Sequence, residues 1–461
     1  MNPLPINLNR RNIILLIIIG VVVVIAISLL GRIGQPRHYK LSQPFASNLA
    51  FARQWDSHTI RYFSGSAFVT YDTATNKSAP LTAVYSLPTV ISDVRWTDSA
   101  VLIHATGYSP VDQLYPKLML ASLSPNRYYW WLINFSTGTI TLVGHASTGA
   151  DVRSATWQDP TTYVYTEAPT DIDDLNVIRA TIGQDGTKLG TLSQRDILAA
   201  ATPDSLIYTV PSGTAANLTV QDLSTHKTKT VVKKVGQILS ASPNGSVFVI
   251  AQPTSTSDET IRGSLVLYNH PKHSTQTISG DFSGSAVWHG NGTDWTATGT
   301  SSSTQPIGFT STSQGSFSFD LPTPGATDDK RPYTSIGQVG DSVLLTNPAN
   351  QLYYASAKPV TGLPKLADFT SLSLGIYQPT FKIIYSSDQQ QYLVHITANP
   401  YDTNVKAAQA YLQSIGYDPY QLRLKWYADD GVDPGFYLPA SFIPIEEPQP
   451  VAPSYGDSIG D

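Results

Sequence analysis

Short runs of β-branched and aromatic residues dominate the chain between residues 47 and 366, and clusters of Gly, Pro, Asn, Asp and Ser separate them. No stretch of this region repeats its apolar residues at the spacing of about 3.6 residues that marks a helix. Short apolar runs divided by turn residues are typical of all-β folds. The sequence therefore predicts one large all-β domain over residues 47–366.

A repeated unit runs through this domain. Each copy places a Trp, or a Ser/Thr-Pro pair, before a polar turn and then a run of β-branched or aromatic residues. The copies begin at Trp55, Trp96, Trp157, Thr202, Ser242 and Trp288, with a looser copy at Gly337. Most of them begin about 40–50 residues apart, which is the length of a four-stranded propeller blade. The one longer interval contains residues 108–128, which we interpret as a loop insertion.

Two hairpins in each copy supply four strands, so the seven copies predict a β-propeller of seven four-stranded blades. An array of β-sandwiches, or two smaller β-domains, with recurring turns is the alternative interpretation. The repeated Trp residues are expected to pack between blades rather than to stack on a ligand.

One copy carries a motif that resembles a known family. Ser242-Pro243-Asn244-Gly245, followed by Val-Phe-Val-Ile, resembles the signature of TolB-like and related WD-repeat-like β-propellers, and Thr202-Pro203-Asp204-Ser205 matches it in part. The resemblance implies a propeller fold. In bacteria such propellers serve as envelope binding and scaffold domains and as non-catalytic domains of some peptidases, so the resemblance does not assign one function.

The N-terminal region contains an uninterrupted apolar run at residues 13–30. Eighteen residues of helix measure about 27 Å, close to the thickness of a hydrocarbon core. We predict a single-pass signal-anchor helix there, after a short segment at 1–12 and before a linker at 31–46. A cleaved signal peptide is the alternative, because Ala26 and Ser28 offer a cleavage site. The flanking charges do not decide the orientation.

Two features favour a location of the C-terminal domain outside the cytoplasmic membrane of a bacterial cell. Only twelve residues precede the apolar run, and the body is rich in Ser and Thr but contains only four Glu. Membrane lipid is therefore an expected partner of residues 13–30.

A small α+β module with ββαβ order is predicted at residues 367–442. Its strands are expected at 381–386, 391–396 and 421–427, and its helix at 402–416, with Asp402 capping the start and Gly416 ending it. Alternatively, residues 381–396 form a hairpin of an eighth or closing blade. The Pro-rich, acidic tail at 443–461 is expected to be extended or disordered and is a candidate docking peptide.

Composition excludes several kinds of chemistry. The 461 residues are 41% hydrophobic and 14% charged, with a net charge of −5 and no Cys. The lack of Cys excludes disulfides, thiolate metal sites and cysteine nucleophiles, and the absence of a basic cluster argues against nucleic acid as a partner. No hydrolase, zinc, phosphate-loop or dinucleotide motif is present. We therefore expect no catalytic residue, no cofactor and no metal.

A candidate interaction surface combines loop aromatics and loop carboxylates. Tyr and Trp on loops suit interfaces, since they join apolar area to a polar group. The acidic loop of the third repeat does not fit a calcium-loop pattern, so a solvated turn is the simpler interpretation. The candidate residues are Tyr108, Tyr115, Tyr128, Asp171, Asp173 and Asp174.

These observations favour a membrane-anchored, extracytoplasmic propeller that acts as a non-catalytic binding or scaffolding module for an envelope protein or a glycan. The alternative is a propeller enzyme, a glycan hydrolase or lyase, that uses Asp residues at the mouth of its channel; the scarcity of Glu weighs against it. A third possibility is a structural envelope protein that recruits a partner through its tail at 443–461.

Overall fold

The computed structural model describes most of the chain between residues 37 and 432. The predicted anchor at 13–30 and the tail at 443–461 lie outside the described residues. Within the described part, no helix is long and apolar enough to cross a membrane. The described residues are 37–65, 67–83, 90–106, 128–144, 151–169, 174–253, 263–289, 294–300, 306–312, 315–321, 333–339, 342–361, 363, 375–387 and 391–432.

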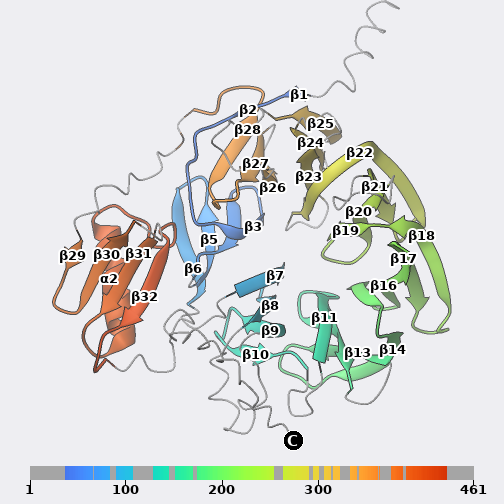
Figure 1. The fold of residues 1–461 in the computed structure, drawn as a ribbon, viewed down its shortest axis with the longest axis horizontal. Coiled ribbons are helices and arrows are strands. Elements are labelled where there is room, and N and C mark those ends of the chain that lie inside the picture. Colours follow the sequence, from blue (N-terminus) through green and yellow to red (C-terminus); the bar gives the residue numbers. More distant parts are fainter. Residues whose placement is uncertain are drawn as a thin grey trace, which may run out of the picture.

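Antiparallel sheets lie side by side around a ring (Figure 1). We call them blades and number them in chain order. Blade 1 consists of β3 (Ala50–Gln54), β4 (Thr59–Phe63), β5 (Ala67–Asp72) and β6 (Lys77–Ala83), and blade 2 of β7 (Val90–Trp96), β8 (Ala100–Thr106), β9 (Tyr128–Asn134) and β10 (Ile140–Leu142). Blade 3 consists of β11 (Asp151–Trp157), β12 (Thr162–Ala168), β13 (Asp174–Thr181) and β14 (Thr187–Ser193), and blade 4 of β15 (Ile197–Ala201), β16 (Ser205–Ser212), β17 (Ala215–Asp222) and β18 (Thr228–Val235).

Blades 5 and 6 share one long strand. The first half of β22 (Ser274–Trp288) pairs with β21, and its second half pairs with β23, so the two blades form one continuous sheet. Blade 5 is completed by β19 (Gln237–Ala241), β20 (Val247–Pro253) and β21 (Gly263–Asn269), and blade 6 by β23 (Trp295–Thr300), β24 (Pro306–Thr312) and β25 (Gly315–Asp320). The short strand β1 (Arg37–His38) adds to β25 in parallel.

The N-terminal segment completes blade 7 and thereby closes the ring. Strands β26 (Thr334–Val339), β27 (Ser342–Thr346) and β28 (Leu352–Ser356) form three strands of this blade, and β2 (Lys40–Leu41) pairs with β28 as the outermost one. Residues from both ends of the ring therefore share one blade, and this pairing closes the ring. The arrangement agrees with the predicted all-β propeller.

Large apolar side chains fill the space between neighbouring blades. Trp96 of blade 2 packs edge-on against Phe68 of blade 1, with ring centroids 5.2 Å apart. Trp157 of blade 3 lies in one buried cluster with Leu102 and Leu132 of blade 2. These two repeated Trp residues have the packing role that the sequence predicts.

The C-terminal module is a separate sheet beside blade 1 (Figure 1). Helix α2 (Tyr401–Ser414) connects β31 (Gln391–Ile396) to β32 (Leu424–Ala428), which run parallel, and β30 (Phe381–Ser386) and β29 (Ile376–Tyr377) complete the sheet. The parallel pair does not fit the alternative of an eighth blade, because the blades are antiparallel within themselves.

The ends of the helix differ in part from expectation. The helix begins at Tyr401 with Pro400 in the capping position, and no side chain caps it. The prediction that Asp402 caps the helix is therefore wrong; Asp402 lies in the first turn, where its charge favours the helix dipole. Gly416 follows the helix with φ +92°, a conformation that favours glycine, as predicted.

The loop between α2 and β32 fixes the module to blade 1. The Asn48 side-chain amide donates to the carbonyls of Leu422 (3.0 Å) and Tyr420 (3.3 Å). The backbone N–H of Ser78 in β6 donates to the carboxylate of Asp418 (3.2 Å). The ring of Tyr420 also belongs to the apolar cluster between blades 7 and 1. Polar and apolar contacts therefore both attach the module to the ring.

Candidate functional site

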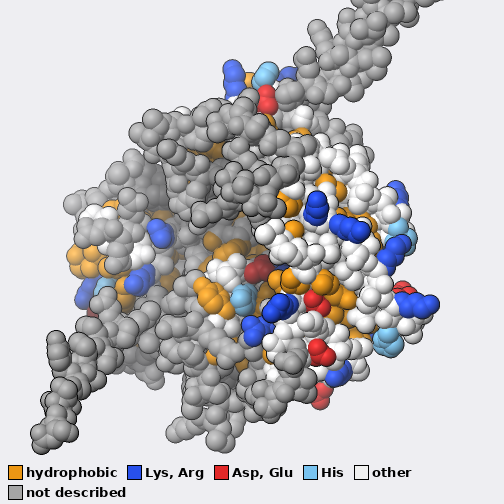
Figure 2. Space-filling model, turned by 45° about the vertical axis from the view of Figure 1, so that its right-hand side comes forward, with side chains coloured by type: hydrophobic (Ala, Val, Ile, Leu, Met, Phe, Trp, Pro, Cys, Tyr) orange, Lys and Arg blue, Asp and Glu red, His pale blue; other side chains and the backbone are white. Residues whose placement is uncertain are grey.

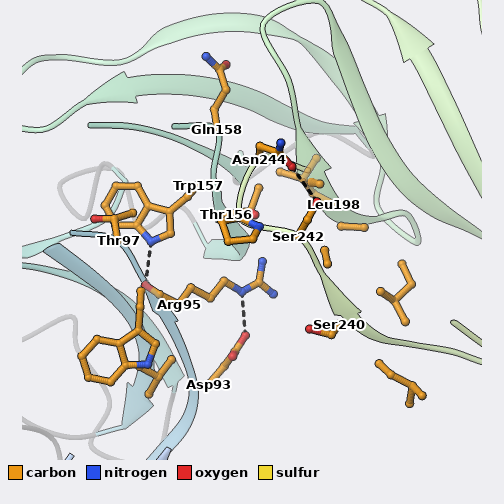
Figure 3. A pocket seen from close by; sticks show the side chains of 18 of the residues that line it. Asp93, Arg95, Thr97, Thr156, Trp157, Gln158, Leu198, Ser240, Ser242 and Asn244 are labelled. Carbon is orange, nitrogen blue, oxygen red and sulfur yellow. Dashed lines mark hydrogen bonds and ion pairs between the residues drawn. The ribbon is translucent and has the colours of Figure 1, made fainter. Parts of the chain in front are cut away.

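A cavity of about 990 Å³ lies inside the ring, among the first strands of blades 1 to 5. Side chains from blades 2, 3, 4 and 5 line this cavity and point toward one another (Figure 3). The polar turns of the repeated unit, such as that of Ser242 and Asn244, line the cavity as well. The repeat detected in the sequence therefore places its turns around one mouth of the channel.

Blade 2 contributes an ion pair to the cavity wall. Asp93 and Arg95 lie on β7 two residues apart, so their side chains leave the same face of the strand. The Arg95 Nε lies 3.0 Å from the Asp93 carboxylate, and its guanidinium lies over the Trp130 ring, 5.2 Å from the centroid. Arg95 is thus held in place and its charge is compensated within the protein.

Arg61 supports the mouth of the cavity between blades 1 and 2. Its guanidinium donates to the carbonyl of Thr97 (2.6 Å) and lies 3.8 Å from the centroid of the Trp55 ring. The indole N–H of Trp55 in turn donates to Asp98 (3.0 Å). Burial lowers the pKa of Arg61 to about 10, which the charges of Asp98 and Asp56 partly oppose.

Arg53 lines the same cavity from β3. Its guanidinium donates to the backbone carbonyl of His289 (3.2 Å), and burial lowers its pKa to about 10. Arg53 therefore stays protonated at neutral pH.

Carboxylates at the mouth are engaged in the turns that carry them. Asp159 accepts the backbone N–H groups of Thr161 (2.9 Å) and Thr162 (2.8 Å). Burial alone would raise the pKa of Asp159, but these hydrogen bonds outweigh it and lower the pKa below its ordinary value. Asp159 is thus a turn-forming anion rather than a proton donor.

One wall of the cavity is apolar. Ile197, the first residue of β15, lines the cavity and is 62% exposed, and Leu198, Ala199 and Ala200 follow it along the same strand. In the space-filling view, hydrophobic side chains with charged ones among them gather near the middle of the described surface (Figure 2). The cavity therefore combines fixed charges with one exposed aliphatic side chain, that of Ile197, while Leu198 and Ala200 are buried.

The structure places the sequence-predicted surface elsewhere. Tyr128 begins β9, is 38% exposed and lies against the ring of His104, with centroids 5.2 Å apart. Asp174 begins β13 opposite Ser193 of β14 and is exposed. Neither residue lines the cavity, so the structure does not bring these two together there. Tyr108, Tyr115, Asp171 and Asp173 lie outside the described residues.

Sequence reasoning missed the arginines of the cavity. Arg53 precedes Trp55 by two residues and Arg95 precedes Trp96 by one, each on the first strand of its blade. The two arginines therefore do not share a repeat position, and the repeat carried no signal for them. Among the described residues, no group of three or more acidic or His side chains could hold a metal ion.

Comparisons with known proteins support the fold alone. No family model matches the chain, and no curated protein is significantly similar to it. TolB from Acinetobacter baumannii is 11% identical with a TM-score of 0.37 over 61% of this chain; the match spans 65% of TolB, less than two thirds of its length. An oligogalacturonate lyase from Vibrio parahaemolyticus is 12% identical (TM-score 0.35; 66% of this chain, 76% of that one).

The propeller domain of the Trilobed protease from Pyrococcus furiosus is 10% identical (TM-score 0.34; 60% of this chain, 98% of that one). The neighbours thus include proteins with different activities. The chain resembles TolB-like β-propellers in fold, as its sequence motif predicts.

Proposed function

We propose that this protein is a non-catalytic binding or scaffolding module for an envelope protein or a glycan, and that its central cavity receives part of that partner. The observation that carries the proposal is the cavity of about 990 Å³, whose wall presents the exposed side chain of Ile197 and fixed charges. Such concave sites, mostly apolar with a few placed polar groups, are the usual form of a binding site.

The state of the carboxylates favours binding over catalysis. A glycosidase needs a carboxylic acid whose pKa is raised so that it can donate a proton. Among the described residues of the cavity wall, Asp93 pairs with Arg95 and Asp98 accepts the Trp55 indole N–H, while the pKa of Asp159 is lowered. The enzyme alternative would gain support if the protein cleaved oligosaccharides and Asp93→Asn abolished the cleavage.

A site-specific photocrosslink tests the binding role. The variant Ile197→p-benzoylphenylalanine places a crosslinker in the cavity, and Ile415→p-benzoylphenylalanine places one on a surface of similar polarity, 40% exposed, in the C-terminal module. We expect a discrete adduct in cells at position 197 and none at 415, reproduced with the purified partner. An adduct at 415 alone would move the binding surface away from the cavity.

We also propose that residues 13–30 anchor the chain in the cytoplasmic membrane as a single span, with the propeller outside the cytoplasm. The support is the length of the apolar run, which suffices to cross a bilayer. Protease digestion of a C-terminal tag in intact cells tests this topology. Tag loss after selective permeabilisation of any outer membrane supports it, and protection until lysis of the inner membrane contradicts it.

A further inference from the structure

Three arginines lie in or beside the cavity, and their environments differ. The charge of Arg95 is paired with Asp93. The guanidinium of Arg61 donates a hydrogen bond to the Thr97 carbonyl and lies over the Trp55 ring. Arg53 donates one hydrogen bond, to the carbonyl of His289. Within the described part of the chain no carboxylate pairs with Arg53, and the buried Nε of Arg53, like that of Arg61, has no hydrogen-bond partner. Of these two arginines only Arg53 lines the cavity.

An arginine in this state is unfavourable unless something compensates it. Burying a charge without a counter-ion lowers the stability of the fold, and a planar guanidinium with free donors fits a carboxylate in two-pronged geometry. Since Arg53 faces the cavity, an anionic group that enters the cavity can reach it. The guanidinium of Arg53, which lines the cavity without a paired carboxylate, therefore points to an anionic ligand.

The rest of the wall indicates what carries the anion. Ile197, which is 62% exposed, offers an aliphatic contact at the cavity wall, which suits an aliphatic side chain. Sugars favour open aromatic faces, but one face of Trp55 is covered by Arg61 and Trp157 is only 6% exposed. An acidic peptide that joins carboxylates to aliphatic residues fits these surfaces better than an acidic glycan does.

We propose that the cavity binds an acidic peptide segment, with a Glu or Asp carboxylate on Arg53 and an adjacent aliphatic side chain on the wall that begins at Ile197. This inference rests on the proposed binding function and narrows its partner from an envelope protein or glycan to a protein segment of stated chemistry.

The probe is a synthetic peptide of that composition, Ile-Pro-Ile-Glu-Glu-Pro-Gln-Pro, which is the sequence of residues 443–450. Its binding is measured by fluorescence anisotropy on the full-length protein in detergent, in a background where Glu446→Gln and Glu447→Gln stop the protein's own copy of the sequence from competing. The version with both Glu replaced by Gln is the first control. We expect binding of the acidic peptide, a loss of at least tenfold in affinity with the Gln version, and a similar loss in Arg53→Met.

Two further measurements separate recognition from a structural role. Lys229→Met removes an exposed cation of β18 that does not line the cavity, and is expected to leave the affinity unchanged. Arg53→Met is expected to unfold at the same temperature as the wild type or a higher one, because it removes an uncompensated buried charge. A lower unfolding temperature of Arg53→Met would show a structural role and overturn the proposal.

The binding measurements with the peptide and with an oligosaccharide can each overturn the acidic-peptide proposal. The proposal is wrong if the peptide fails to bind, or binds equally well to Arg53→Met. If a trigalacturonate oligosaccharide binds in its place and depends on Arg53, the acidic-glycan interpretation replaces it. A specific crosslink at position 197 would uphold the general binding role in either case, so the two proposals can fail separately.

Discussion

The indole N–H of Trp157 donates to the backbone carbonyl of Arg95 over 2.7 Å. Trp157 ends the first strand of blade 3, and Arg95 lies on the first strand of blade 2, so the bond joins two blades at the cavity wall. It also fixes the backbone from which the Arg95 side chain extends. The repeated Trp therefore links the packing of the ring to the geometry of the site.

Substitution of Trp157 is expected to separate the hydrogen bond from the packing. Trp157→Phe keeps most of the apolar volume and loses the bond, so the free energy of unfolding should fall by about 1 kcal/mol beyond any loss of volume. Trp157→Ala leaves a cavity between blades and should lower it by about 3–5 kcal/mol. Urea unfolding measures both. Equal losses in the two variants would contradict the packing role.

The repeat rhythm predicted the ring because each blade is a local structure. Three consecutive strands of a blade and their turns, such as β16 to β18, lie within the copy that begins at Thr202, so composition and turn residues report them directly. Ring closure has no such signal. The pairing of Lys40 and Leu41 with Ser356 and Ala355 joins residues more than 300 positions apart, and a two-residue strand shows no periodicity.

The site was harder to predict than the fold. The sequence pattern suggested Tyr128 and Asp174 as loop residues, but each begins a strand, β9 and β13. Whether the end of a strand borders the cavity depends on its place in the blade, which the sequence pattern does not give. The cavity residues Arg53 and Arg95 lie on strands. Alternation tells which strand positions share a face, whereas burial of that face toward the axis depends on how the blades are arranged around the ring.

Gly337 of blade 7 permits a close contact with blade 1. A Cβ at position 337 would overlap the side chain of Gln54, which is buried and accepts the backbone N–H of Gln338. Gly337→Ala should therefore displace Gln54 and weaken ring closure, lowering the free energy of unfolding by about 1–3 kcal/mol.

Gly190→Ala in β14 is the matched control, because a Cβ there meets nothing within 4 Å. Urea unfolding of both variants against the wild type measures the effect. If both alanines changed the midpoint equally, a general effect of removing glycine would explain the result, and the contact with Gln54 would be unimportant.

His289 should make stability depend on pH. It is buried and hydrogen-bonded through Nε2 to Thr296 (3.0 Å). Burial lowers its pKa to about 4; Asp294 opposes this shift and Arg53 adds to it. The unfolded chain therefore takes up a proton below about pH 6.5 that the folded chain does not take up until about pH 4.

The contribution of His289 to stability is complete above pH 6.5 and is lost progressively as the pH falls toward 4. The free energy of unfolding should fall by about 3 kcal/mol over this range, because the pKa of His289 differs between the unfolded and folded chain (6.5 against about 4) and each pKa unit corresponds to about 1.36 kcal/mol. His289→Gln cannot take up this proton, so its free energy of unfolding should fall less between pH 7 and 4. Denaturant titrations at several pH values test this, and parallel pH profiles of variant and wild type would contradict it.

Asn48 holds the C-terminal module to the ring through its side chain. Its amide donates to the carbonyls of Ser64 (2.7 Å), Leu422 and Tyr420, and its backbone adopts φ +63°. Asn48→Ala removes the donors and also strains the backbone. Asn48→Gly removes the donors but accepts the positive φ, so the pair distinguishes the two effects.

We expect both variants to speed hydrogen exchange of residues 417–423 by about tenfold or more, since a lost hydrogen bond to partly buried carbonyls costs about 1–3 kcal/mol. Ser47→Ala, which removes one bond to the Gln421 carbonyl (2.8 Å), should have a smaller effect. If Asn48→Gly exchanged like the wild type while Asn48→Ala did not, backbone conformation rather than the amide would position the module. The exchange of α2 itself should change little, because its own apolar cluster with the module's sheet does not depend on the ring.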